Sequence, residues 1–126
     1  MIVFDSSAII AYFQSEKGNE VVDEYLQKDL SAISTVNFCE TILKLKQSQL
    51  DTDIILIEIG RLEFNIIDCT KEISLLATEI THPENMFLSL GDRICLATAI
   101  HHKSSVLTAD SNWKKLKLPI EVIAIR

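Results

Sequence analysis

The sequence near the start of the chain reads Ile2-Val3-Phe4-Asp5-Ser6-Ser7-Ala8-Ile9-Ile10. Three apolar residues of strand type stop at a carboxylate, and small polar residues that suit the start of a helix follow. A strand that runs directly into a helix is the repeating unit of an α/β domain. Further short apolar runs, each bounded by polar or turn residues, occur at 32–33, 65–67, 105–107 and 121–125. These runs are predicted to be strands, most of them buried.

Segments with helical periodicity separate the predicted strands. Their apolar positions are Val21, Val22, Tyr25 and Leu26; Val36, Cys39, Ile42, Leu43 and Leu45; Ile54, Ile57 and Leu62; Ile73, Leu76, Ala77 and Ile80; and Ile94, Leu96, Ala97 and Ile100. Because parallel strands need helical crossovers, this alternation predicts an α/β fold with a central, mainly parallel sheet of about five short strands and helices on both faces. Functional residues are expected at the carboxyl ends of the strands.

Length and composition indicate one domain, residues 1–126. Of the 126 residues 48% are hydrophobic and 24% charged, and the mean hydropathy is +0.22, which suffices for a packed core. Three irregularly spaced cysteines fit neither a disulfide framework nor a zinc site. No apolar run approaches the ~18 residues of a membrane span, and the early Asp5 is unlike a signal peptide. We expect a soluble, cytoplasmic protein with no membrane partner.

The charge balance excludes one way of binding nucleic acid. Twelve Lys and Arg against eighteen Asp and Glu give a net charge of −6, so a broad cationic surface is excluded. Four acids, Asp5, Glu40, Asp92 and Asp110, nevertheless lie in otherwise apolar or small-residue segments, at strand ends or helix starts. Taken singly, each is also explained as a helix cap or a surface charge.

Taken together, the four acids predict a metal site. Carboxylates gathered in a partly apolar crevice repel one another unless a cation is present. Oxygen ligands without a histidine or cysteine set favour Mg²⁺ or Mn²⁺. Such an ion activates water and stabilises the charge of a phosphodiester during its displacement, so the pattern predicts metal-dependent phosphoryl transfer.

Four segments together resemble PIN-domain ribonucleases, and more narrowly the VapC-type toxins of bacterial and archaeal toxin–antitoxin systems. They read VFDSSAII (3–10), STVNFCE (34–40), LSLGDRICLA (88–97) and LTADSNW (107–113), in the order and approximate spacing of that family. The resemblance implies a PIN domain over residues 1–126 that cleaves RNA by a metal-activated water. It implies that Asp5 and Asp92 are the principal Mg²⁺ or Mn²⁺ ligands, with Glu40 and Asp110 acting directly or through water.

The resemblance also implies supporting residues and partners. Ser7, Asn37 and Thr108 fall where the family keeps small polar residues, and we expect them to orient carboxylates and water, although turn and cap roles fit equally well. Cations follow the acids in sequence: Arg93, Lys44 and Lys46, and Lys114, Lys115 and Lys117. They form either a rim that contacts RNA phosphates or ordinary solvated faces. A VapB-like antitoxin and a homodimer are implied as partners.

We expect the histidines, Trp113 and the segment 81–87 to lie outside the catalytic set. His82, His101 and His102 fit no ligand pattern and are expected at the surface or rim. Trp113 is expected to pack, with base stacking as the alternative. The segment 81–87 is not distinctive of the family and is expected to form a variable rim loop, with Pro83 ending the helix before it.

Two other functions stay open at this point. The first is a catalytically silent PIN scaffold that acts by binding alone, against which the presence of all four acids weighs. The second is a receiver-like, Mg²⁺-binding signalling domain. A receiver needs adjacent acids after its first strand, a phosphoacceptor Asp after a middle strand and a late Lys. Here Ser6 follows Asp5, Asp68 is flanked by Ile67 and Cys69, and residues 108–110 are Thr-Ala-Asp.

Overall fold

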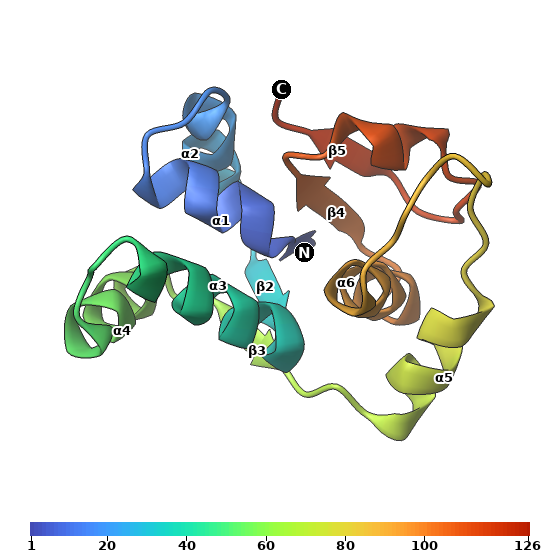
Figure 1. The fold of residues 1–126 in the computed structure, drawn as a ribbon, viewed down its shortest axis with the longest axis horizontal. Coiled ribbons are helices and arrows are strands. Elements are labelled where there is room, and N and C mark those ends of the chain that lie inside the picture. Colours follow the sequence, from blue (N-terminus) through green and yellow to red (C-terminus); the bar gives the residue numbers. More distant parts are fainter.

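A five-stranded parallel sheet forms the centre of the structure, a computed structural model that describes residues 1–126. Its strands are β1 (Ile2–Phe4), β2 (Ser31–Ser34), β3 (Asn65–Ile67), β4 (Ser105–Thr108) and β5 (Val122–Ala124). They lie in the order β3-β2-β1-β4-β5 (Figure 1). The predicted α/β fold with a parallel sheet is therefore confirmed, and all five predicted strands are present.

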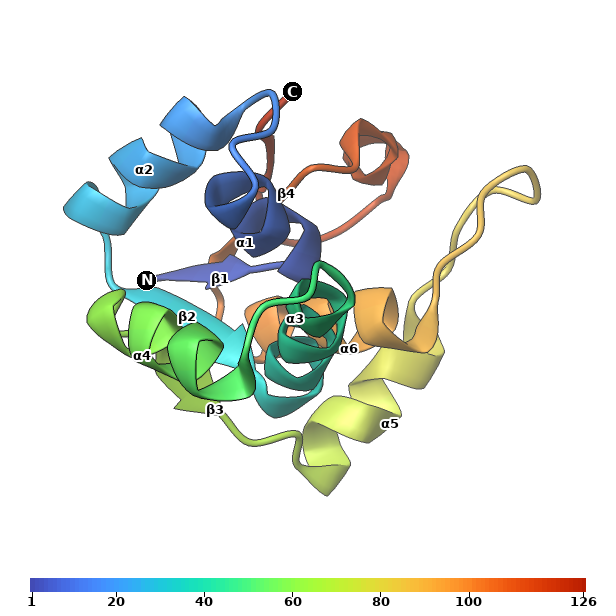
Figure 2. The same ribbon diagram turned by 60° about the vertical axis from the view of Figure 1, so that its left-hand side comes forward.

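Helices connect each strand to the next, as the periodicity predicted (Figures 1 and 2). They are α1 (Ser6–Phe13), α2 (Asn19–Lys28), α3 (Thr35–Gln47), α4 (Thr52–Arg61), α5 (Lys71–Glu79) and α6 (Leu90–His101), with the short 3-10 helix η1 (Ser111–Lys115) before β5. None of the helices is both long and apolar enough to cross a membrane. Helix α5 ends at Glu79, earlier than Pro83 requires, because Ile80 already has an extended backbone.

Both faces of the sheet are covered. Along β1, Ile2 and Phe4 point to one face and Val3 to the other, as the two-residue period of a strand dictates, and all three are buried. Ile2 and Phe4 pack with residues of α1 and α2, whereas Val3 packs with residues of α5, α6 and η1, including the fully buried Trp113. The two layers confirm the helices predicted on both faces and the packing role predicted for Trp113.

The strand order places a crevice at the centre of the sheet. Strands β2 and β3 lie on one side of β1, and β4 and β5 lie on the other. In open α/β sheets, ligands bind outside the carboxyl ends of the strands at such a switch point. Phe4 lies opposite Leu107, so Asp5 and Thr108 follow side by side. The order also differs from the 2-1-3-4-5 order of receiver domains, so the receiver-like alternative is wrong.

The predicted inner face of α4 is wrong. Ile54 and Ile57 are 53% and 56% exposed, whereas Ile55 and Ile59 are buried against Leu45 of α3. Apolar residues occupy four consecutive positions, 54–57, and position 59, so helical periodicity does not distinguish the inner face of this helix from its outer one.

Helix α3 and strand β3 also differ in part from the prediction. In α3, Cys39 and Leu43 are exposed, and the buried face carries the polar Asn37 and Thr41. Hydrogen bonds satisfy both side chains: the Thr41 hydroxyl donates to the main-chain carbonyl of Asn37 at 2.8 Å, and the Asn37 amide donates to Glu40 and to the Gly91 carbonyl. Most of the strands were predicted to be buried; β3 is an exception, with Ile66 45% exposed, because β3 is an edge strand.

Candidate active site

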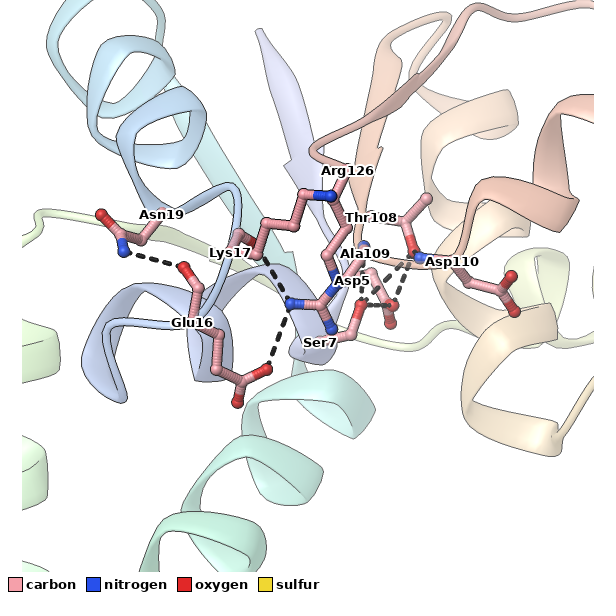
Figure 3. Close-up of polar contacts among 9 residues, drawn as sticks. All are labelled: Asp5, Ser7, Glu16, Lys17, Asn19, Thr108, Ala109, Asp110 and Arg126. Atoms are coloured by element: carbon pink, nitrogen blue, oxygen red, sulfur yellow. Dashed lines mark hydrogen bonds and ion pairs between the residues drawn. The ribbon is translucent and has the colours of Figure 1, made fainter.

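Asp5 occupies the first position after β1, and its carboxylate does not cap α1. Although Asp5 has the N-cap position of that helix, its side chain accepts no capping hydrogen bond. Its Oδ2 instead accepts hydrogen bonds from Ser7 Oγ at 2.5 Å and from Thr108 Oγ1 at 3.0 Å (Figure 3). The residue is only 4% exposed. A cap does not explain Asp5, and a buried carboxylate held by two hydroxyls needs another explanation.

The hydroxyls of Ser7 and Thr108 tie the start of α1 to the end of β4. Ser7 Oγ accepts from the Ala109 N–H at 2.9 Å, and Thr108 Oγ1 accepts from the Asp110 N–H at 3.1 Å (Figure 3). Because each hydroxyl also donates to Asp5, the position of that carboxylate is set by two separate segments. The structure thus brings Ser7 and Thr108 to the place expected for residues that orient a carboxylate.

Glu40 lies beside the start of α6 and is held by Asn37. The Asn37 amide donates to Glu40 Oε1 at 2.8 Å and to the Gly91 carbonyl at 3.1 Å. Ser6 Oγ donates to the same Glu40 oxygen at 3.4 Å. Asn37 is itself fully buried and accepts from the Ser34 hydroxyl. This network fixes the carboxylate of Glu40 against α6.

Asp92 forms the capping box that the sequence suggested. Its Oδ2 accepts from the Ser89 N–H at 3.0 Å, and its own N–H donates to Ser89 Oγ at 3.1 Å. The capping interpretation of Asp92 is therefore confirmed. Capping uses one carboxylate oxygen of Asp92 and leaves the other without a hydrogen bond. Because Asp92 is half-buried, this second oxygen adds negative charge beside the crevice.

The electrostatics show that three of these acids are near one another. Burial raises the pKa of Asp5 from 3.8 to about 6; the Ser7 and Thr108 hydrogen bonds lower it, and the charges of Asp92 and Glu40 raise it. None of these three acids takes part in an ion pair; the ion pairs are Lys28–Glu24, Arg61–Glu58 and Arg126–Glu16. The crevice therefore holds negative charge that no cationic side chain neutralises.

A buried thiol lies close to the same three acids. Cys95 is fully buried in α6, and burial raises the pKa of its thiol well above the usual range. The charges of Asp5, Asp92 and Glu40 raise that pKa further. The charges of the same three carboxylates thus act on one buried thiol of α6, which agrees with their lying on the same side of the sheet's centre.

The backbone of Asp110 lies next to the residues that hold Asp5, but its carboxylate does not. Its carboxylate accepts from the Asn112 N–H at 3.0 Å and caps η1. Figure 3 shows the side chain directed away from Asp5. No three Asp, Glu, His or Cys side chains converge into a ready-made metal-ligand group. Of the four predicted acids, the structure gathers Asp5, Glu40 and Asp92, and it directs the carboxylate of Asp110 elsewhere.

The gathered acids fit Mg²⁺ or Mn²⁺ better than a metal that needs a full protein cage. Mg²⁺ keeps several waters and is usually bound through one or two carboxylates plus phosphate oxygens. Asp5 and Asp92 each use one carboxylate oxygen in the hydrogen bonds above, which leaves one oxygen on each. Hard oxygen donors bearing unneutralised negative charge match such an ion.

Comparison with known families identifies the domain. A family model described as PIN domain matches residues 2–118. The chain belongs to the PIN domain family. A sequence search of curated proteins finds no match.

Several solved structures share the fold of this PIN domain. VapBC2 from Rickettsia felis, bound to a DNA fragment from its promoter, is 14% identical with a TM-score of 0.73, covering 97% of each chain. A toxin–antitoxin complex from Klebsiella pneumoniae is 21% identical with a TM-score of 0.68, covering 96% of this chain and 99% of that one. FitAcB from Neisseria gonorrhoeae is 18% identical with a TM-score of 0.72, covering 99% and 98%.

The cations of the PIN domain are not all free for a ligand. The Arg93 guanidinium donates to the carbonyls of Ala77 and Ile80, at 3.1 and 2.8 Å, and so stabilises the end of α5. This differs from the phosphate contact expected for Arg93. Lys44 and Lys114 are exposed, and so are Lys46, Lys115 and Lys117. Lys44 lies one turn beyond Glu40 on α3, while Lys114 lies on η1.

The histidines lie at the surface as expected. His101 and His102 are exposed at the end of α6, and the ring of the half-buried His82 contacts the Pro83 carbonyl. None of them forms a metal-binding group with neighbouring Asp, Glu or Cys side chains.

Four residues of the site were not among the predicted ones: Ser6, Ser34, Gly91 and Cys95. Ser6 and Ser34 were visible only as neighbours of predicted residues, and their roles depend on hydrogen bonds between distant segments. Gly91 carried a signal, because it is one of only three glycines and lies within a predicted helix. Cys95 carried none, because a buried cysteine in an apolar helix is ordinary.

Proposed function

We propose that this PIN domain is an Mg²⁺- or Mn²⁺-dependent endoribonuclease and the toxin of a VapBC-type toxin–antitoxin pair. The observation that carries the proposal is the buried Asp5 beside Asp92 and Glu40, with no cationic side chain paired to any of them. A folded protein keeps such a cluster at a cost, since its members repel one another. A divalent cation would neutralise the repulsion among these carboxylates and could act on a phosphodiester.

Each residue of the crevice has a defined part in the proposal. Asp5 and Asp92 hold the ion through the carboxylate oxygens that their hydrogen bonds leave available. Ser7 and Thr108 keep the Asp5 carboxylate in place and lower its pKa, which favours the ionised form that binds a cation. The bound ion supplies an activated water and stabilises the charge that develops on the phosphate.

Glu40 and Asp110 act less directly. Asn37 holds the Glu40 carboxylate against α6, where it can accept a hydrogen bond from a water in the crevice. Asp110 contributes through its backbone N–H to Thr108, and its carboxylate reaches the ion only after it leaves the cap of η1. We therefore rank Asp5 and Asp92 above Glu40, and Glu40 above Asp110, in their effect on cleavage.

The proposed partners follow from the toxin role. The structures of similar fold are VapBC and FitAB proteins or a toxin–antitoxin complex, which supports a VapB-like antitoxin for this chain. The negative crevice gives the antitoxin a place for an arginine or lysine, because complementary charge favours such a contact. The proposal also includes a homodimer. A reading frame directly upstream that encodes a small DNA-binding protein with an arginine-bearing tail would support this part.

Cleavage by purified protein tests the proposal. The full chain is incubated with RNA in millimolar Mg²⁺ or Mn²⁺ and, separately, in EDTA. We expect cleavage with metal, none in EDTA, and none from Asp5→Asn or Asp92→Asn. Asp68→Asn is the matched control, because Asp68 is exposed and also follows a strand, the edge strand β3. Cleavage by Asp5→Asn at the wild-type rate would overturn the proposal.

A binding measurement separates the nuclease from a PIN domain that acts by binding alone. Mg²⁺ or Mn²⁺ should raise the melting temperature of the wild type and of Asp68→Asn, because a ligand of the native state stabilises it, but should not raise that of Asp5→Asn. A metal-dependent rise without any RNA cleavage would favour the catalytically silent alternative. No rise in the wild type would count against the metal site itself.

A further inference from the structure

A small cavity lies beside the acidic crevice, between the segment that joins α5 to α6 and the helix η1. Its volume is about 210 Å³, and its lining is mostly polar: Asn85, Met86, Phe87, Asp110, Asn112 and Lys115. Figure 2 shows the segment between α5 and α6 extending away from the sheet. This segment contains residues 81–87, which were predicted to form a rim loop and lie outside the helices and strands.

The cavity is connected to the acids by hydrogen bonds. Asp110, which lines it, donates its N–H to Thr108 Oγ1 at 3.1 Å, and Thr108 Oγ1 donates to Asp5 Oδ2 at 3.0 Å. Two hydrogen bonds therefore separate a wall of the cavity from the carboxylate proposed to hold the metal ion. A wall of the cavity is therefore part of the hydrogen-bond network that holds Asp5.

An aromatic ring stands at the cavity with nothing packed over it. Phe87 is 81% exposed, more than any other large apolar side chain of the chain, while its neighbour Leu88 is buried. The ring therefore contributes little to the packed core and is available to a ligand. An exposed aromatic ring beside polar groups is suited to stack on a planar ligand.

The polar groups of the cavity suit the edge of a nucleobase. Asn85 and Asn112 offer amide donors and acceptors, the pattern that proteins use on exposed base edges of single-stranded RNA. Lys115, which donates to the Asn112 side chain at 3.2 Å, supplies a cation for a phosphate. The volume lies below the ~300 to 1,000 Å³ of drug-sized pockets, and therefore suits one planar base.

We propose that this cavity is a nucleobase subsite in which Phe87 stacks on one base of the RNA while Asn85 and Asn112 read its edge. The proposal rests on the proposed ribonuclease function and adds to it the feature that selects the cleavage sequence. A hydrophobic segment of a protein partner is the competing occupant of Phe87. The mostly polar lining and the nearby Lys115 favour the base.

Binding by the inactive Asp5→Asn protein tests the subsite without relying on cleavage. Fluorescently labelled eight-nucleotide homopolymers of A, C, G and U are titrated with Asp5→Asn and with Asp5→Asn/Phe87→Ala, in Mg²⁺. We expect Asp5→Asn to prefer at least one homopolymer over the others. The added Phe87→Ala should weaken binding of that homopolymer by about tenfold, within the range for loss of one stacked base, and should level the four affinities.

Three further variants sharpen the test. Asp5→Asn/Leu30→Ala is the matched control, because Leu30 is 77% exposed but precedes β2, at the amino ends of the parallel strands, whereas Asp5 lies at their carboxyl ends. It should bind like Asp5→Asn. Asn85→Ala and Asn112→Ala, each added to Asp5→Asn, should reduce the preference among bases more than the overall affinity. In the active wild-type background, Phe87→Ala should flatten the base preference next to the cleavage sites in a random RNA pool.

The outcomes separate the subsite from the nuclease. Equal affinities of Asp5→Asn and its Phe87→Ala derivative for all four homopolymers, or no binding by either, overturn the subsite even if the wild type cleaves RNA. Loss of base preference with Phe87→Ala supports the subsite even if no cleavage is found. If Phe87→Ala leaves RNA binding unchanged and weakens binding of the antitoxin, the protein partner is the occupant and the proposal is wrong.

Discussion

The carboxylate of Glu40 fills the space in which a side chain at Gly91 would lie. A Cβ built on Gly91 would overlap all three carboxylate atoms of Glu40. Asn37 holds that carboxylate in place and also donates to the Gly91 carbonyl. The glycine therefore lets an acid from α3 approach the backbone of α6 one residue before Asp92.

Gly91→Ala should separate stability from activity. The new methyl displaces the flexible end of Glu40, while alanine favours a helix over glycine by ~1 kcal/mol, so we expect little change in the free energy of unfolding. RNA cleavage should fall, because Glu40 leaves its position beside Asp5 and Asp92. Urea unfolding and cleavage rates on the same preparation measure both effects.

Gly60→Ala is the matched control for Gly91→Ala. Gly60 is also helical, in α4, but nothing lies within 4 Å of a Cβ there. This variant should be more stable by about 0.5 to 1 kcal/mol and should cleave RNA at the wild-type rate. Full activity of Gly91→Ala would show that the position of Glu40 is unimportant for cleavage.

The buried Asp5 should make stability depend on pH. Its pKa is raised from 3.8 to about 6, so the folded state favours the protonated carboxyl. That contribution to stability is present in full below pH ~4 and is lost as the pH rises through about 6, by at most about 3 kcal/mol. In EDTA, the free energy of unfolding of the wild type should therefore fall relative to that of Asp5→Asn across this range.

The difference between the two proteins is the informative quantity, because other groups titrate in both. Urea denaturation at pH values from about 4 to 7.5 gives the two curves. Above pH 6 and without metal, Asp5→Asn should be the more stable protein, and Mg²⁺ or Mn²⁺ should narrow the gap by stabilising only the wild type. Parallel curves over the whole range would mean that Asp5 does not carry the raised pKa.

Much of this site could be predicted because its first part is local in sequence. Ile2–Phe4 form a buried strand, and the residue after a central strand of a parallel sheet must lie at the carboxyl edge, where Asp5 lies. The capping box of Ser89 and Asp92 is likewise a pattern of four consecutive residues. Such features depend on the nearest neighbours along the chain, which the sequence displays directly.

What could not be predicted depends on contacts between distant segments. The direction of the Asp110 carboxylate is a choice between the cap of η1 and the crevice, and both are compatible with the sequence LTADSNW. The burial of Ile55 and Ile59 instead of Ile54 and Ile57 depends on where α3 lies, because α4 is apolar on both sides.

Removal of either hydroxyl beside Asp5 should shift the pH dependence of cleavage. Hydrogen bonds from Ser7 and Thr108 lower the pKa of Asp5, so Ser7→Ala or Thr108→Val should raise that pKa further. The acid limb of the profile of kcat/KM against pH should then move to higher pH. Thr108→Ser, which keeps the hydroxyl, should restore the wild-type profile. Thr78→Val is the control, since the Thr78 hydroxyl bonds only to the Leu75 carbonyl within α5.

An unchanged acid limb in both Ser7→Ala and Thr108→Val would contradict this prediction. A loss of activity that is equal at every pH would contradict it too, because that result indicates displacement of the carboxylate and not a change in its ionisation. The profile must therefore be measured from about pH 5 to 8 for each variant, with the folded fraction checked at each pH.

Arg93 and Lys114 should differ in what their loss removes. Arg93→Met loses two hydrogen bonds from a charged donor to the Ala77 and Ile80 carbonyls, so we expect a loss of roughly 1.5 to 3 kcal/mol in the free energy of unfolding. Lys114 is exposed on η1, and Lys114→Met should change that free energy by less than about 0.5 kcal/mol.

For RNA binding we expect the opposite order: the loss of Lys114 should have the larger effect and the loss of Arg93 the smaller. Lys114→Met should raise the KM for RNA and make it less sensitive to salt, as expected when one phosphate contact is lost. The folded fraction of Arg93→Met should keep the wild-type KM, because its guanidinium serves the end of α5 and not the rim. If Arg93→Met instead weakened the salt dependence while its stability stayed unchanged, the guanidinium would have to leave the α5 carbonyls when RNA binds, and Arg93 would be a rim residue after all.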